Sequence, residues 1–152
     1  MKKYYLAYGS NLNINEMAFR CPSAKKIGIV NMKDYRLVYK GSDNMFSYLT
    51  IEECQGYNVP LGLYEISYFD IFSLDKYEGY PELYSKFYIP IKINKKEINA
   101  LIYIMNEGFD YYLPSTDYVE RCIKGYEDFG FDTTILDTAL LDTIENMKKK
   151  IR

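Results

Sequence analysis

Residues 4–12 read Tyr-Tyr-Leu-Ala-Tyr-Gly-Ser-Asn-Leu, and this stretch organises the rest of the chain. Tyr and Leu favour a buried strand, Gly tolerates backbone angles denied to other residues, and Ser and Asn bond locally to backbone amides. Asn13 can cap a following helix, with Glu16 as its reciprocal partner. A strand, a tight turn and a helix start leave N–H groups aimed at one point, which suits an anion or a developing oxyanion. An ordinary tight turn is the alternative interpretation.

The composition limits the class of protein. A chain of 152 residues is long enough for one core and too short to expect two, so we expect a single domain over residues 1–152. Aromatic residues make up 17% of the chain, with 18 Tyr, which predicts a packed globule with hydroxyls at cavity walls. The formal charge of −2 offers no basic excess, so we expect neither a nucleic-acid nor a membrane partner. A homodimer is compatible with the sequence.

The cysteines and the apolar runs bear on the cellular compartment. Cys21, Cys54 and Cys122 are too few and too scattered for a disulfide framework or a zinc knuckle, so we expect reduced thiols and no metal. The apolar run before Gly9 is shorter than the ~7–15 residues of a signal-peptide core, and no later run approaches the ~20 residues that span a bilayer. These features predict a cytoplasmic location.

The chain contains no His, which excludes Ser-His-Asp triads, Cys-His dyads, HExxH zinc sites and imidazole acid–base catalysis. At neutral pH, a carboxyl group with a raised pKa is the commonest substitute. Glu78 lies at the end of a predicted helix, in the sequence Tyr77-Glu78-Gly79-Tyr80-Pro81. Aromatic neighbours in a cleft would raise its pKa above the ordinary value. A surface Glu before a helix-capping Gly79 is the alternative.

Hydrophobic periodicity predicts the strands. Residues 25–40 form one strand, and its alternate positions Ile27, Ile29, Tyr35, Leu37 and Tyr39 define a single buried face. Residues 45–51 and 59–66 form two further strands, one on each side of Gly56. Residues 87–93 and 98–104 alternate cleanly and form a hairpin.

Helical patterns occupy the remaining segments. A capping box at Ser67 and Asp70 starts a helix that ends at Glu78, a second helix runs from Ser115 or Thr116 to Gly130, and an amphipathic helix closes the chain. About six strands with short connections, and helices gathered at the ends, predict an α+β fold. We expect a curled mixed β-sheet that closes toward a small barrel, with flanking helices, because closure removes exposed edges.

The stretch Ala7-Tyr8-Gly9-Ser10-Asn11-Leu12 resembles the substrate loop of the γ-glutamylcyclotransferase family. Further segments resemble the family's motifs in the right order: Arg20 to Ala24 with Asp34 to Leu37, Leu74 to Gly79, and Pro114 to Tyr118 with Gly125. The resemblance spans roughly residues 4–131 and implies the same α+β architecture.

This resemblance implies a cofactor-independent cyclotransferase. The α-amino group of a small γ-glutamyl substrate attacks its own γ-carbonyl, which releases 5-oxoproline and a free amine. Glu78 aligns with the catalytic glutamate and would act as general acid and base. The resemblance also implies these substrate-binding residues: Tyr5, Leu6, Ala7, Tyr8, Gly9, Ser10, Asn11, Tyr84, Tyr103 and Tyr118. For Tyr118, a core aromatic position on its helix is the alternative.

Several alternatives remain open at this point. Asp75 is either the second carboxylate of a dyad or a helix-surface or capping residue. The spacing in 78–84 is similar to the branch of the family that acts on γ-glutamylamines, whereas 8–12 and 114–118 resemble the branch that acts on γ-glutamyl amino acids, so the leaving amine is not determined. A catalytically silent γ-glutamyl-binding or protein-interaction module on the same fold is the rival function, and the intact loop with Glu78 favours the enzyme. A hydrolase or amidase with one of the three Cys as nucleophile is the third candidate.

Overall fold

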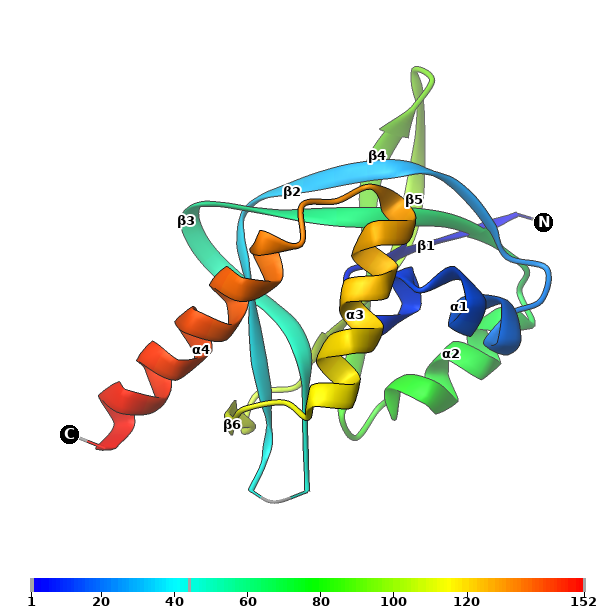
Figure 1. The fold of residues 1–152 in the computed structure, drawn as a ribbon. Coiled ribbons are helices and arrows are strands. Elements are labelled where there is room, and N and C mark those ends of the chain that lie inside the picture. The colour runs from blue at the N-terminus through cyan, green and yellow to red at the C-terminus, as the bar shows by residue number, and fades with distance from the viewer. Residues whose placement is uncertain (1, 44, 152) are drawn as a thin grey trace.

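A computed structural model describes residues 2–43 and 45–151, with the backbone alone for residue 151. In Figure 1 the long β2 and β3 ribbons arch together over α3 and then turn down toward β6. The elements in chain order are β1 (Lys3–Ala7), the short 3-10 helix η1 (Ser10–Leu12), α1 (Ile14–Arg20), β2 (Lys25–Ser42), β3 (Phe46–Ile66), α2 (Asp70–Glu78), β4 (Tyr84–Ile93), β5 (Lys96–Met105), β6 (Asp110–Tyr111), α3 (Thr116–Phe129) and α4 (Thr134–Ile151).

One mixed sheet connects the strands. Among the described residues it has six strands in the order β4-β5-β1-β3-β2-β6. β1 pairs with β3 in antiparallel orientation and with β5 in parallel orientation, and the other pairs are antiparallel. The expected α+β fold with a curled mixed sheet is confirmed. The closure is partial, because β4 and β6 remain edge strands of a half-barrel.

β3 differs from the prediction. Residues 45–51 and 59–66 were expected as two strands, but a single strand of 21 residues runs from Phe46 to Ile66 and pairs with β2 on both sides of residues 54–57, which have no partner in the register. Gly56 adopts φ +89° without ending the strand. Gly56 lies opposite the register shift at Asp34 of β2. The Asp34 carboxylate accepts a hydrogen bond from the Gly56 N–H at 3.0 Å. This irregularity, with Asp34 on one strand and residues 54–57 on the other, therefore absorbs the segment that the sequence suggested was a break.

The predicted single buried face of β2 is wrong at its beginning. Leu37 and Tyr39 are buried, but Ile27 and Ile29 are exposed, the latter to 59%. Asp34 has φ +64° at a register shift between Lys33 and Tyr35. Because the side chains of a strand alternate, the left-handed residue at this irregularity moves the inward face of β2 from even to odd positions. Before the irregularity the inward residues are Val30 and Met32, which pack against the core.

α2 is fixed at both ends, and this places Glu78. The Asp70 N–H donates to the Ser67 hydroxyl at 3.2 Å, and the Ser67 N–H donates to the Asp70 carboxylate at 2.8 Å. This reciprocal pair confirms the predicted capping box. At the other end Gly79 adopts the left-handed conformation, with φ +65°, as a helix C-cap commonly does. Glu78 is the last residue before that cap, so its backbone position is determined by the helix end.

α3 packs directly on the turn that follows β1. The Ser115 hydroxyl caps the helix by accepting the Tyr118 N–H at 3.1 Å, and Gly130 ends it with φ +70°. Gly125 lies against the chain at the end of η1, where a Cβ atom added to it would stand 2.6 Å from the backbone nitrogen of Asn13. The absence of a side chain at this position allows the two backbones to meet.

α4 is a long helix that contacts β2. The Thr143 hydroxyl accepts the Tyr39 N–H at 2.9 Å, which ties α4 to the sheet. In the part of the chain that the structure describes, no helix combines the length and the apolar character needed to cross a membrane.

Gly125→Ala is expected to destabilise the fold. Ala is the better helix former by about 1 kcal/mol, but its Cβ would collide with backbone atoms, which cannot move aside as a flexible side chain can. Overpacking of this kind costs about 1–3 kcal/mol, so we expect a net loss in the free energy of unfolding measured by urea denaturation. Gly28→Ala is the control, because nothing lies within 4 Å of its added Cβ. Equal stability of the two variants would contradict close packing at Gly125.

Candidate active site

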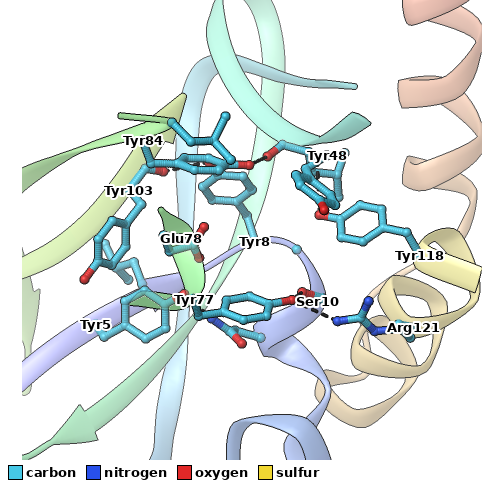
Figure 2. Close-up of a pocket in the computed structure, with 15 residues that line it drawn as sticks. Tyr5, Tyr8, Ser10, Tyr48, Tyr77, Glu78, Tyr84, Tyr103, Tyr118 and Arg121 are labelled. Atoms are coloured by element: carbon cyan, nitrogen blue, oxygen red, sulfur yellow. Dashed lines mark hydrogen bonds between the residues drawn. The ribbon is translucent and has the colours of Figure 1, made fainter. Parts of the chain in front are cut away.

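A cavity of about 140 Å³ opens where β1, η1, the end of α2 and α3 approach the concave side of the sheet (Figure 2). Its walls combine aromatic rings with a small number of polar groups, which is typical of a small-molecule site. The lining residues are Tyr5, Leu6, Tyr8, Gly9, Ser10, Asn11, Tyr48, Leu49, Tyr77, Glu78, Leu83, Tyr84, Tyr103, Tyr118 and Arg121.

The turn after β1 presents its backbone to the cavity. The first hydrogen bond of η1 runs from the Leu12 N–H to the Gly9 carbonyl, at 3.0 Å. The N–H groups of Gly9 and Ser10 therefore precede the first turn and donate to no other described residue. Two donors without a described partner therefore lie at the start of η1, and the anion-binding role expected from the sequence stays a prediction.

Gly9 has a packing role in addition to the backbone role that the sequence suggested. Its φ is −122°, so the turn does not use the positive φ that glycine often supplies. A Cβ atom at this position would lie 3.2 Å from the Tyr118 hydroxyl and 3.7 Å from the Cβ of Leu49. Gly9 therefore allows the turn to approach the opposite wall.

Asn11 joins the turn to its surroundings. Its side-chain amide donates to the Tyr5 hydroxyl at 3.0 Å and accepts from Arg20 Nη1 at 2.7 Å. Its backbone carbonyl accepts the Tyr64 hydroxyl at 2.7 Å. Buried polar groups that are fully bonded in this way fix a conformation, because breaking any one bond leaves another group unsatisfied.

Glu78 reaches the cavity from the end of α2. It keeps part of its surface accessible through the cavity, while protein atoms surround it on the other sides. Figure 2 shows its carboxyl group among the rings of Tyr5, Tyr8, Tyr84 and Tyr103. No hydrogen bond joins this carboxyl group to another described residue. A carboxyl group in such a position is available to a ligand.

Burial changes the protonation of Glu78. Loss of solvation raises its pKa from 4.5 to about 8, and the nearby Arg20 opposes this shift only in part. The direction agrees with the expectation from the aromatic sequence around Glu78. A pKa near neutrality allows one group to accept a proton and to return it.

The tyrosine walls are held by the backbone. The Tyr84 hydroxyl donates to the Leu49 carbonyl at 2.7 Å, and the Leu49 N–H donates to the Tyr118 hydroxyl at 3.1 Å. The Tyr8 hydroxyl donates to the Tyr103 carbonyl at 2.6 Å. Tyr118 is therefore a buried aromatic residue of α3 that also lines the cavity, and its contact with a substrate stays a prediction.

Asp75 lies outside the cavity, in contact with Tyr103 of its wall. Its carboxylate accepts the Tyr103 hydroxyl at 2.7 Å and pairs with Lys86 Nζ at 3.0 Å. It does not line the cavity. Asp75 therefore orients a wall residue, which is neither of the roles considered from the sequence.

The structure gathers most of the residues singled out in the sequence around one cavity. The exception is Ala7, which is buried in the core and does not line it. The lining residues that sequence analysis missed are Tyr48, Leu49, Tyr77, Leu83 and Arg121. Arg121 was predictable, because it lies three residues after Tyr118 on the same face of a predicted helix. Tyr48 and Leu49 were not, because their place depends on how β3 curves.

The thiols are poorly suited to nucleophilic catalysis. Cys21 and Cys122 are buried, and loss of solvation raises the pKa of each thiol to about 12. Cys54 is only partly buried. None of the three lines the cavity. Because the thiolate is the reactive form, the hydrolase or amidase alternative has no support at this site.

Comparisons with known proteins identify the family and the fold. The sequence model of the family described as "Gamma-glutamyl cyclotransferase, AIG2-like" matches residues 5–120. The gamma-glutamylcyclotransferase of Bos taurus is 28% identical over 137 residues, which cover 83% of this chain and 71% of the bovine protein. Among solved structures, a gamma-glutamyl cyclotransferase matches with a TM-score of 0.78 at 22% identity, over 91% of this chain and 86% of its own. An uncharacterized protein from Homo sapiens matches with a TM-score of 0.77 at 23% identity, over the same shares.

Folding stability is expected to report the burial of Glu78. Because its folded-state pKa is above its unfolded value, the native state holds this proton more tightly, and stability is lost as the pH rises from about 4.5 to about 8. Glu78→Gln carries no such titration. The free energy of unfolding of Glu78→Gln, measured by denaturant titration between pH 5 and 8.5, should therefore increase relative to that of the wild type as the pH rises. A difference that does not change with pH would contradict the raised pKa.

Proposed function

The chain belongs to the gamma-glutamyl cyclotransferase, AIG2-like family, and from this premise we propose that it is a γ-glutamyl cyclotransferase with Glu78 as its general acid and base. Family membership confirms the resemblance seen in the sequence. The proposed substrate is a γ-glutamyl amino acid, peptide or amine, and the proposed products are 5-oxoproline and the free amine.

The observation that carries the proposal is the state of Glu78. Its carboxyl group faces the cavity without a hydrogen-bond partner among the described residues, and its pKa is raised to about 8 by burial. A structural carboxylate would normally be paired, because an unpaired buried charge is costly. An unpaired carboxyl group beside a turn with unused N–H donors is what an acid–base reaction at a carbonyl requires.

The proposed reaction exchanges one amide bond for another. The α-amino nitrogen forms a bond to the γ-carbonyl carbon, and the bond from that carbon to the leaving nitrogen breaks. From the ammonium form, the attacking nitrogen loses two protons, and the leaving nitrogen gains two as it departs as an ammonium ion. Glu78 can accept one of these protons and pass it to the leaving nitrogen, while the other is exchanged with water. Neither a metal nor a second substrate enters this balance.

Orientation is the main task of such a site. The nucleophile is tethered to its target, and a correct near-attack geometry can contribute about 7–11 kcal/mol. In this proposal the N–H groups of Gly9 and Ser10 bind the developing oxyanion or the α-carboxylate of the substrate. In comparable oxyanion holes, one donor is worth about 2.7–4 kcal/mol.

A catalytically silent γ-glutamyl-binding or protein-interaction module is the second candidate. A binding module needs the cavity but not a carboxyl group with a pKa near neutrality. The presence of Glu78 together with an intact turn at Tyr8 to Asn11 favours the enzyme.

The direct test is turnover of a substrate panel. Purified protein is incubated with γ-glutamyl dipeptides and γ-glutamylamines, and 5-oxoproline is measured by mass spectrometry. We expect 5-oxoproline from at least one class. Binding of the panel to folded protein without release of 5-oxoproline would favour the silent module.

Glu78→Gln should retain binding and lose turnover. Gln keeps the size of the side chain but cannot accept a proton, and general acid–base groups contribute about 10²- to 10⁴-fold, so we expect a loss near or beyond the upper limit. The wild-type kcat/KM should rise with pH up to about 8, where the free carboxyl group ionises. Glu82→Gln is the matched control, because this exposed carboxylate lies outside the cavity and should leave the rate unchanged. Turnover of Glu78→Gln within tenfold of wild type would remove Glu78 from this role.

A further inference from the structure

Arg121 introduces a positive charge into a cavity of otherwise mainly aromatic and small residues. Glu78 and Arg121 are the two charged side chains among the described residues that line it. Arg121 extends from α3, and Figure 2 shows its guanidinium group beside Tyr77 and Tyr118. Because the deep end of the cavity holds Glu78, the two charged groups divide the site into a reacting end and a cationic end.

The cationic end is the open one. Tyr5, Tyr8, Tyr84 and Tyr103, which surround Glu78, are all buried. Tyr77 is 37% exposed, and the Arg121 side chain is 32% exposed. A substrate whose γ-carbonyl lies beside Glu78 would therefore extend its departing amine toward Arg121 and solvent.

The guanidinium group is oriented but not saturated. Nε donates to Glu16 at 2.9 Å, and Nη2 donates to Glu16 at 2.7 Å and to the Tyr77 hydroxyl at 2.8 Å. Among the described residues, the acidic partner of Nη1 is the Asp117 carboxylate at 3.9 Å, which is too long for a hydrogen bond, and that side chain is 83% exposed. Both Nη1 hydrogens are therefore available, since an arginine offers five N–H donors.

Arg121 shares its nearest carboxylate with a second arginine. Arg121 and Arg20 both bond to the same carboxylate oxygen of Glu16, at 2.7 and 2.8 Å. Burial would raise the pKa of Glu16, but the hydrogen bonds from the two arginines outweigh it and hold the pKa below the usual value. The two arginines thus share Glu16, and the second carboxylate near Arg121, that of Asp117, is longer-range and exposed to solvent, so the Nη1 edge of Arg121 keeps capacity for a further anion.

We propose that Arg121 is the specificity residue of this site, and that its free Nη1 edge binds a carboxylate carried by the departing amine. This inference rests on the proposed function, which places the γ-carbonyl beside Glu78. Glu16 and Tyr77 hold the guanidinium group in place, so little side-chain freedom is lost when the carboxylate binds. The Tyr77 hydroxyl also shares a hydrogen bond of 2.6 Å with the Ser10 hydroxyl, which couples this end of the cavity to the turn after β1.

The proposal predicts a preference that can be measured as binding and as turnover. γ-Glutamylalanine and γ-glutamylethylamine differ only by the carboxylate on the departing amine. Glutarylalanine and glutarylethylamine are the matching binding probes, because they lack the α-amino nucleophile and cannot cyclise. A charge-assisted hydrogen bond typically changes affinity by about 10- to 100-fold, so the wild type should prefer the carboxylate member of each pair by that factor.

Arg121→Met should remove the preference for the carboxylate member of each pair and leave binding of the amine member nearly unchanged. Binding of glutarylalanine, measured by calorimetry, should weaken by about 10- to 100-fold, while binding of glutarylethylamine changes by less than about threefold. In turnover the loss on γ-glutamylalanine should appear mainly in KM. Arg121→Lys keeps the charge without the oriented edge and should restore part of the preference. Lys124→Met is the matched control on α3, because Lys124 pairs with Asp128 outside the cavity and its loss should leave the preference intact.

Each other outcome has a distinct meaning. Equal weakening of both probes in Arg121→Met would overturn the proposal, because it would place Arg121 on the carboxylate that the probes share or in a structural role. An unchanged preference, or no binding of either probe to the wild type, would also overturn it. A carboxylate preference that depends on Arg121 without any 5-oxoproline would leave the carboxylate site standing and overturn the proposed reaction.

Discussion

The close packing of η1 is the constraint on which the rest of the structure depends. Ser10, Asn11 and Leu12 are buried, although they belong to a connecting turn. Leu12 fits there because Gly62 of β3 and Gly125 of α3 have no side chains: an added Cβ would lie 2.5 Å from the Leu12 side chain at the first position and 2.7 Å from it at the second. The turn thereby locks the sheet to α3, and the cavity forms where these elements meet. The site and the core share the same contacts.

Glu78 adds a second constraint, which acts against stability. An ionised carboxylate in this position is disfavoured by burial, and no paired cation among the described residues compensates it by a direct contact. The fold tolerates this cost because α2 is capped at both ends and the tyrosine hydroxyls around the cavity are bonded to backbone groups. Groups held against their own preference are typical of functional sites, where the surrounding structure determines their position.

Interactions between residues close in the chain predicted most helices and strands, whereas the curvature of the sheet could not be predicted from the sequence. Capping pairs such as Ser67 with Asp70 depend on neighbours in the chain, so their outcome was predictable. The continuity of β3 through Gly56 and the outward position of Ile29 depend on the irregularity at Asp34, which pairing across the sheet decides. In the site, the family-like motifs led to Glu78 and the turn after β1. Tyr48 lines the cavity because β3 curves, and no sequence motif predicts that curvature.

The residues that line the cavity differ in how firmly hydrogen bonds tie their side chains to the sheet, and so in how readily they can be replaced during evolution. Tyr84 and Tyr118 both attach to the Leu49 peptide, so replacing either ring disturbs the backbone of β3 as well as the wall. Leu83 and Arg121 line the same space without such attachments to the sheet. Divergence among related chains should therefore concentrate at these two positions, so that new leaving groups can be accommodated without change to the tyrosines around Glu78.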